Sequence, residues 1–397
     1  MILSILAMYV LGMDDVVVSN KIGAGKQKLV FTQDLRFGGG DADKELWMDG
    51  QFPANFTIMQ NGHFLVADAK NARIQEFDAK GKFVRTFAEN GEGPGEFRGM
   101  GSLFTLSDGS IIGHDWFNGT SKFVYFDKNG KYVDTRAVVN SNYSFFFVTF
   151  APSGKNFYSG YMSFDMEKNT MDYHSGVFND DLKPIKVFGS SPMGTPNNSL
   201  NDTEAFLRSI ADQIEAVISR NTWVASFNTD NEVLVSDVRK YEITKYSPDM
   251  KSKRATIKMD YKPRLFTEED KQEMAEWLME VILEQAPQAR QSLNTSMMMR
   301  AVKMAKLPEV HNPIADMIPM EDDKFLVVHD YSYSSGKISG QVFNGSGECI
   351  GNFDFPGLGV WDPFATRLKF SNGYAYAMER NEDGDNIMAR YTYKLTR

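Results

Sequence analysis

One aspartate position recurs in several similar stretches of the 397-residue sequence. Each of these residues ends a short apolar run that follows a polar turn; they are Asp68, Asp115, Asp237 and Asp330. A ring of carboxylates can hold a cation or a basic ligand. The same side chains can instead accept hydrogen bonds from the backbone of their own turn, as Asp commonly does. Because the position is repeated, the second interpretation is favoured.

Two histidines, His114 and His329, directly precede two of these aspartates. A metal shared by both would require their ring nitrogens to lie roughly 4 Å apart. Both histidines are predicted to lie one strand away from the central axis of the fold, which does not favour such a short distance. A polar lining of a central pocket is the better-supported role for the pair. Trp116, next to Asp115, is a further candidate binding residue.

Three other stretches suggest chemistry, and each has a structural alternative. Arg73 can contact an anionic partner, although an ion pair with an acidic residue of a neighbouring repeat is favoured. Residues 381–386 resemble the start of a calcium loop but lack its full register and closing Glu, which favours a simple turn. Methionines in 296–304 can bind copper(I), but more often fill irregular apolar contacts. We therefore predict no metal or other cofactor.

The stretch FAENGEGPGEF, residues 87–97, places three glycines and a proline around two glutamates. Such a loop can cradle a phosphate, provided that a helix begins directly after it. It can also connect two units of a repeated fold. The second interpretation is favoured because the next residues predict a strand.

Six stretches combine a polar turn with a short apolar run, which predicts a turn leading into a β-strand. They begin at residues 61, 108, 153, 230, 322 and 371, so that their spacings are 47, 45, 77, 92 and 49 residues. Three spacings match the roughly 40–50 residues of a four-stranded propeller blade. The two longer spacings fit one blade plus an insertion each.

A second repeat follows the first and begins at residues 77, 126, 178, 246 and 343. In each copy an aromatic residue is followed by a polar turn and then by a strand, an order that is typical of a β-hairpin. The last unit is one strand short, whereas 28–37 predicts a strand without a unit of its own. Adding 28–37 as the outer strand of the last unit closes the ring and removes open edges. We predict an all-β fold, a single six-bladed propeller domain over 15–397 with four-stranded blades.

The two insertions, about 197–220 and 264–310, have helical patterns. Apolar residues at 206, 210, 214 and 218 step by four and define one buried stripe. Thr267 is a suitable N-cap, and the acidic residues 268–270 suit the first turn of a helix. A short third helix is expected around 297–306. Because apolar helix faces must be covered, we predict a helical cap over part of the loop-rich face, with any ligand under or beside it.

Charge and termini restrict the function further. The net charge of −9 argues against a nucleic-acid binder, which normally has a basic surface. Residues 1–14 begin with about a dozen apolar residues, too few for a membrane span of about 20. They have the length of an export-signal core but lack its basic flank and cleavage site. We interpret 1–14 as a truncated export signal; the alternative is an N-terminal strand packed on the body.

The stretch 61–97 resembles an NHL repeat, including the Asn-x-Arg-Ile motif from Asn71 to Ile74 and the Gly-x-Gly-Pro-Gly-x-Phe connection at 91–97. From Lys28 to Thr135 the chain resembles bacterial six-bladed propellers of the NHL-like type, many of which are exported or lipid-anchored. The run 306–314 is also similar to that group. The resemblance implies an interaction platform, a sensor or, in one branch, an amidating lyase. The chain lacks a cysteine near its start, which argues against a lipid anchor.

We expect a non-catalytic, exported protein, periplasmic or on the cell surface, that is monomeric and binds a peptide, protein or carbohydrate on its capped face. The alternative is a lyase or lactone hydrolase with a divalent cation in its central channel. That alternative needs three or four converging metal ligands, which the sequence does not identify. No catalytic residue is predicted, and the candidate binding residues are Asp68, Arg73, His114, Asp115, Trp116, Asp237, His329 and Asp330.

Overall fold

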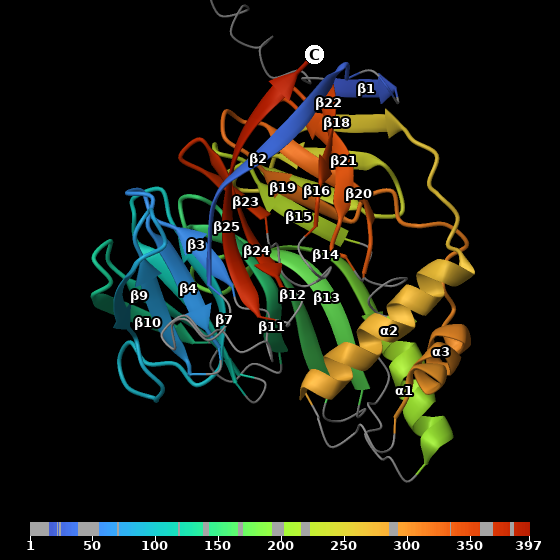
Figure 1. Cartoon of the computed structure of the whole chain (residues 1–397), viewed down its shortest axis with the longest axis horizontal. Coiled ribbons are helices and arrows are strands. Elements are labelled where there is room, and N and C mark those ends of the chain that lie inside the picture. Colours follow the sequence, from blue (N-terminus) through green and yellow to red (C-terminus); the bar gives the residue numbers. More distant parts are fainter. Residues whose placement is uncertain are drawn as a thin grey trace, which may run out of the picture.

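The structure, a computed structural model, describes residues 16–21, 23, 25–38, 55–69, 71–117, 120–137, 143–165, 170–192, 202–215, 223–285, 293–333, 335–357, 368–381 and 385–397. Strands dominate this part of the chain, and three helices lie together on one side of it (Figure 1). The predicted export signal at 1–14 lies outside the described residues. No helix in the described ranges is long and apolar enough to cross a bilayer.

Four-stranded antiparallel meanders are the repeating element of the fold, and we number them unit 1 to unit 6 in chain order. Unit 1 contains β3 (Phe56–Ile58), β4 (Phe64–Asp68), β5 (Arg73–Phe77) and β6 (Phe83–Phe87). Unit 2 contains β7 (Met100–Thr105), β8 (Ile111–Phe117), β9 (Thr120–Phe126) and β10 (Tyr132–Ala137). Unit 3 contains β11 (Tyr143–Phe150), β12 (Asn156–Asp165), β13 (Thr170–Asn179) and β14 (Pro184–Pro192).

The second half of the chain continues this order. Unit 4 contains β15 (Trp223–Phe227), β16 (Val233–Asp237), β17 (Glu242–Tyr246) and β18 (Lys253–Asp260). Unit 5 contains β19 (Asp316–Pro319), β20 (Phe325–Tyr331), β21 (Ile338–Phe343) and β22 (Cys349–Phe355). Unit 6 contains β23 (Leu368–Ser371), β24 (Tyr374–Arg380) and β25 (Asn386–Thr396), with β2 (Gln27–Gly38) from the N-terminal part as its fourth strand.

The strand β2 joins the two ends of the described chain. It pairs antiparallel with β25 over most of its length, from Lys28 opposite Thr396 to Gly38 opposite Ile387. This is the pairing predicted for 28–37. Its first residues also pair in parallel with β22, so that units 5 and 6 form one eight-stranded sheet, which the sequence did not predict.

The strand β1 (Val16–Lys21) is a further difference from the sequence prediction. It pairs in parallel with β18 and gives unit 4 a fifth strand. Asn20 holds it to unit 5, because its amide donates to the carbonyl of Gly347 at 3.0 Å and its side-chain oxygen accepts from the backbone N–H of Cys349 at 2.8 Å. The edge of unit 4 is thereby covered.

Alternation along the strands gives every unit two apolar faces, because successive side chains point to opposite sides of a sheet. In β4, Phe64 and Val66 pack against unit 6, whereas Leu65 and Ala67 pack against unit 2. Further junctions of this kind connect units 2 and 3, 3 and 4, 4 and 5, and 5 and 6. Each unit therefore packs on the next, and unit 6 packs on unit 1.

The glycine-rich stretch 87–97 connects β6 to β7, and no helix follows it. It closes on itself, because Gly91 N–H donates to the carbonyl of Phe97 at 2.9 Å and Gly93 N–H donates to the side chain of Glu96 at 2.7 Å. Phe97 is fully buried between units 1 and 2, where its ring stacks on Phe126 with centroids 6.1 Å apart. The stretch is a connection between units, as predicted, and lacks the helix that a phosphate cradle requires.

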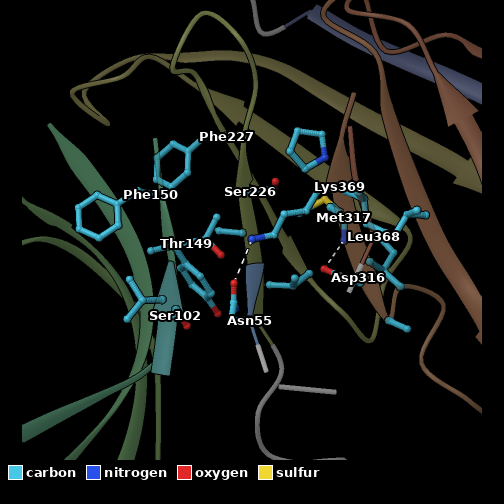
Figure 2. A pocket seen from close by; sticks show the side chains of 18 of the residues that line it. Asn55, Ser102, Thr149, Phe150, Ser226, Phe227, Asp316, Met317, Leu368 and Lys369 are labelled. Carbon is cyan, nitrogen blue, oxygen red and sulfur yellow. Dashed lines mark hydrogen bonds between the residues drawn. The ribbon is translucent and has the colours of Figure 1, made fainter. Parts of the chain in front are cut away.

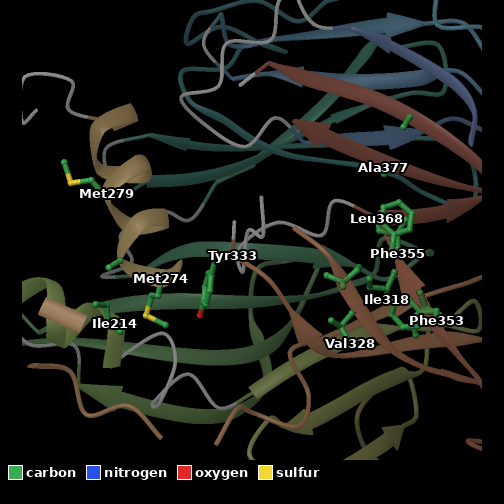
Figure 3. Packing of buried hydrophobic residues seen from close by; sticks show 14 of the residues in the cluster. Ile214, Met274, Met279, Ile318, Val328, Tyr333, Phe353, Phe355, Leu368 and Ala377 are labelled. Carbon is green, nitrogen blue, oxygen red and sulfur yellow. The ribbon is translucent and has the colours of Figure 1, made fainter. Parts of the chain in front are cut away.

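The predicted insertions contain α1 (Thr203–Glu215), α2 (Glu268–Gln285) and α3 (Thr295–Met304). Thr267 caps α2 as predicted: its hydroxyl accepts from Asp270 N–H at 3.2 Å, while the Asp270 carboxylate accepts from Thr267 N–H at 2.7 Å. Apolar residues of the helices join the same cluster as those between units 5 and 6 (Figure 3). Position 218, the last of the apolar stripe predicted for the first insertion, lies outside the described residues.

Replacement of Phe97 tests the packing between units 1 and 2. We expect Phe97→Ala to lower the free energy of unfolding by about 3–5 kcal/mol, because a fully buried aromatic ring is lost from a packed junction. Val133→Ala is the matched control, since Val133 on β10 is 62% exposed and should change stability by less than about 0.5 kcal/mol. Urea unfolding of both variants measures the difference. Equal stability of the two variants would contradict the packing of Phe97 between units 1 and 2.

Candidate functional site

A cavity of about 700 Å³ lies where the first strands of the units converge. Every unit contributes a residue from its first strand; they are Thr57, Phe104, Thr149, Ser226, Asp316 and Lys369. Figure 2 shows four of them, Thr149, Ser226, Asp316 and Lys369, around the cavity on separate strands. The size is in the range of ligand-binding pockets, which commonly measure about 300–1,000 Å³.

Two helices form part of the cavity wall. Ile210 and Ile214 of α1 and Met274 and Trp277 of α2 line it. Trp277 packs against Tyr333, which also lines the cavity, with ring centroids 5.5 Å apart. The apolar faces of the insertions therefore contribute to the wall of the cavity. That the helices cap a loop-rich face of the ring stays a prediction.

The helix α2 is anchored to the loop after β20. The Glu273 carboxylate accepts from the Ser332 hydroxyl at 3.0 Å and from the Tyr333 N–H at 3.3 Å. Near the start of α2, Arg264 donates to Asp270 at 2.8 Å and to Asp330 of unit 5 at 3.0 Å. These contacts hold the helix at the cavity.

Lys369 on β23 is the cationic side chain that lines the cavity. Its Nζ donates to the side-chain oxygen of Asn55 at 3.1 Å and to the backbone carbonyl of Phe56 (Figure 2). Nζ also lies 5.1 Å from the ring centre of Phe56 and 5.8 Å from that of Phe104. No carboxylate in the described part of the chain forms an ion pair with it. Burial without a counter-charge lowers the pKa of Lys369 to about 7.

The other titratable groups at the cavity are acidic residues and tyrosines. Asp316 accepts a hydrogen bond from its neighbour Met317 N–H at 2.7 Å, and Glu321 accepts from Gly373 N–H at 2.7 Å. Burial raises the pKa of Tyr158 to about 12 and raises the pKa of Tyr331 as well. The tyrosine hydroxyls are therefore protonated donors at neutral pH.

The first predicted residues, Asp68 and Arg73, bind each other inside unit 1. Asp68 is buried and accepts from Arg73 Nε at 2.7 Å and from the Asn71 side chain at 2.8 Å. Its carboxylate also accepts from the backbone N–H of Asn71 at 3.2 Å, in its own turn, as the favoured interpretation stated. Arg73 does form an ion pair, but the prediction of a partner in a neighbouring repeat was wrong, because Asp68 lies opposite it on the adjacent strand of the same unit.

The other three aspartates have different partners. Asp237 binds Arg239 in its own turn, at 2.8 and 2.6 Å, as expected. Asp115 accepts instead from Gly99 N–H at 2.6 Å, before β7, and pairs with Lys122 Nζ at 3.2 Å. Asp330 pairs with Arg264 outside its unit. The expectation of a partner in the aspartate's own turn is therefore met at Asp68 and Asp237, whereas the described contacts of Asp115 and Asp330 lie elsewhere.

His114 and His329 lie at different junctions. His114 is buried and stacks on Phe123 with centroids 4.9 Å apart; burial lowers its pKa to about 4. His329 lies between the Tyr261 hydroxyl at 3.2 Å and the Gln341 amide at 2.9 Å. Trp116 is 39% exposed and donates to the Ser144 hydroxyl at 2.8 Å.

None of the eight predicted residues lines the central cavity. Over the described ranges, no group of three or more His, Cys, Asp or Glu residues could hold a metal ion. Between β24 and β25, Asn381 and Asp385 bind each other, with Asp385 N–H donating to the Asn381 side chain at 2.7 Å. Lys369 and the hydroxyl residues of the first strands were missed; the sequence signal for Lys369 is a lysine between the apolar residues Leu368 and Phe370.

Residues 56–218, less than half of the chain, match the profile of the DUF5128 family, described as a 6-bladed beta-propeller. No curated protein matches the sequence. Solved structures of similar shape include a Bacteroides fragilis protein believed to be exported. Its sequence is 10% identical, the alignment covers 96% of this chain and 100% of that chain, and the TM-score is 0.49. A DUF4221 family member from Bacteroides vulgatus has 10% identity, coverage of 93% and 99%, and a TM-score of 0.48.

Virginiamycin B lyase from Staphylococcus aureus is a third similar structure, with 9% identity, coverage of 92% of this chain and 99% of that chain, and a TM-score of 0.41. Identity at this level provides no basis for transferring an activity. The function must therefore be argued from the cavity itself.

Acidification tests the burial of His114. Because its pKa is about 4 in the fold and 6.5 when the side chain is solvated, the unfolded chain binds more protons than the folded chain between these values. Stability is therefore lost as the pH falls from 6.5 towards 4. We expect the wild type to lose roughly 2 kcal/mol more than His114→Gln between pH 7 and pH 5, measured by urea unfolding. If the unfolding free energies of the wild type and His114→Gln change equally with pH, His114 is not buried as described.

Lys369 has a different pH window. Its folded-state pKa of about 7 lies below the usual 10.5, so the folded chain binds fewer protons than the unfolded chain between pH 7 and pH 10. Stability contributed by this group therefore rises with pH across that range. We expect the unfolding free energy of the wild type to rise by roughly 1–3 kcal/mol more than that of Lys369→Gln between pH 7 and pH 9. An identical pH dependence in both proteins would show an ordinary, solvated lysine.

Proposed function

We propose that the six units are the blades of a six-bladed propeller, and that the protein is a non-catalytic receptor that binds a small organic ligand in the central cavity. The cavity carries this proposal. It lies at the meeting point of all six units, has about 700 Å³ of space and is walled on one side by α1 and α2. A volume of this size, with a few convergent polar groups, is typical of a ligand-binding site.

The composition of the wall suggests the class of ligand. Large aromatic residues line it, among them Tyr173, Trp223 and Trp277. Hydroxyl groups of Ser102, Thr149 and Ser226 also line it. Aromatic faces bind apolar or ring-shaped groups, and hydroxyls can donate and accept hydrogen bonds. A short peptide or a carbohydrate meets both requirements.

The proposal includes a location outside the cytoplasm, in the periplasm or on the cell surface, and a monomeric state. The apolar residues at the start of the sequence and the NHL-like resemblance support the location. The alternative, an enzyme with a divalent cation in the channel, needs a converging ligand set, and the described residues supply none. One tightly held cation per chain in a metal analysis of the purified protein would favour that enzyme instead.

Filling the cavity tests the proposed site. The probe is N-phenyl-1-naphthylamine, a neutral aromatic dye whose fluorescence rises in apolar sites. Thr149 on β11 is half-buried and lines the cavity, so that Thr149→Trp should occupy the space that the dye needs. We expect the wild type to bind one dye per chain and the variant to bind at least about tenfold more weakly, a loss of about 1.4 kcal/mol.

Val84→Ala is the control for the dye experiment, because Val84 on β6 is 45% exposed and does not line the cavity. It should bind the dye as the wild type does. Circular dichroism and urea unfolding establish that Thr149→Trp remains folded. Equal dye affinity of a folded Thr149→Trp variant and the wild type would exclude the cavity as the binding site.

A further inference from the structure

We infer that Lys369 is the anchor for an oxyanion, such as the carboxylate of an acidic peptide or sugar, and that the central cavity selects organic anions. This inference rests on the proposed ligand site and adds the charge of the ligand. Its basis is the position of one amine, at the convergence of the six first strands, whose described contacts are all neutral groups.

The hydrogen bonding of Lys369 leaves room for a ligand. An ammonium group has three N–H donors. Two are directed to the side-chain oxygen of Asn55 and the carbonyl of Phe56. No other protein acceptor of Lys369 is found in the described part of the chain. Since Lys369 also lines the cavity, its remaining donor is available to an acceptor inside it.

The charge balance indicates which acceptor fits. Burial of an ammonium group is costly unless an opposite charge is nearby. The contacts of Lys369 are two neutral oxygens and the rings of Phe56 and Phe104, which compensate a cation only in part. A ligand oxyanion would supply the missing charge and form a charge-assisted hydrogen bond, which is about twice as strong as a neutral one.

Other charged groups at the cavity restrict where the anion can lie. Asp316 of β19 and Glu321, just beyond that strand, are the carboxylates that line it. Glu321 is engaged by Gly373 N–H at 2.7 Å and by the Tyr393 hydroxyl at 3.2 Å. Asp316 would repel a ligand carboxylate, so the anion is expected on the side of Lys369 that faces β3 and β7. Removal of the Asp316 charge should therefore strengthen anion binding.

Two dyes with one scaffold provide the test. N-phenyl-1-naphthylamine is neutral, and 8-anilinonaphthalene-1-sulfonate adds a sulfonate that stays ionised at every pH used. We expect the wild type to bind the sulfonate at least about tenfold more tightly than the neutral dye at pH 6.5. Lys369→Gln keeps a donor for the carbonyl of Phe56 but loses the charge. It should abolish this preference and leave the affinity for the neutral dye unchanged. Asp316→Asn should increase the preference.

Two controls separate the cavity from the surface. Lys337→Met removes a lysine that does not line the cavity and should leave both affinities unchanged. Thr149→Trp should lower the affinity for both dyes. If the neutral dye binds and Lys369→Gln leaves the preference for the sulfonate intact, the inference about Lys369 is wrong and the ligand site stands. If neither dye responds to Thr149→Trp, both the site and the anchor are wrong.

A pH series gives a readout that a structural role of Lys369 would not produce. Burial lowers the pKa of Lys369 to about 7, so the empty protein loses this charge near neutral pH. Sulfonate affinity should fall by at least about fivefold from pH 6.5 to pH 9 in the wild type and stay flat in Lys369→Gln. The other titratable groups that face the cavity are Asp316, Glu321, Tyr158, Tyr173, Tyr331 and Tyr333. Because both dyes meet these groups, the neutral dye corrects for their titration.

Discussion

The structure depends on one packing constraint: every unit has two apolar faces, and each face must be covered by another unit. A linear row of such sheets would expose one face at each end. Here the faces of units 1 and 6 cover each other, through Phe64 and Val66 on one side and Tyr376 and Met378 on the other. The strand β2 reinforces this closure, because it completes unit 6 with a segment from the other end of the chain. The open edges that promote aggregation are thereby reduced.

The closure also creates the cavity. The first strands of the units surround a common space, and their inward side chains are small or polar at several positions, such as Thr57, Thr149 and Ser226. Lys369 spans the junction of units 6 and 1, since its amine on β23 binds Asn55 and Phe56 at the start of β3. The same lysine thus contributes to closure and presents a charge to the cavity. A ligand that binds Lys369 therefore contacts this junction.

Much of this fold could be predicted from the sequence, because its strands repeat a local pattern of turn and apolar run. The pairing of 28–37 with the last strand followed from the missing strand, and the cap on α2 followed from Thr267. The strand β1 and the pairing of β2 with β22 could not be predicted. The residues of β1 read Val-Val-Val-Ser-Asn-Lys, which is no alternation of apolar and polar residues. Both pairings are with strands more than two hundred residues away.

The candidate site was harder to predict for a physical reason. The repeated aspartates were prominent because they recur in four units. A residue that recurs from unit to unit tends to serve what the units share, such as a turn or a junction; Asp68 and Asp237 each bind an arginine of their own unit. A ligand site at the centre needs groups that differ between units, because a ligand is rarely six-fold symmetric. Lys369 meets that requirement: it occupies a first strand whose counterparts contribute Thr57, Phe104, Thr149, Ser226 and Asp316. In a closed ring of repeated units, the unrepeated residue on an inner strand is therefore the stronger indicator of function.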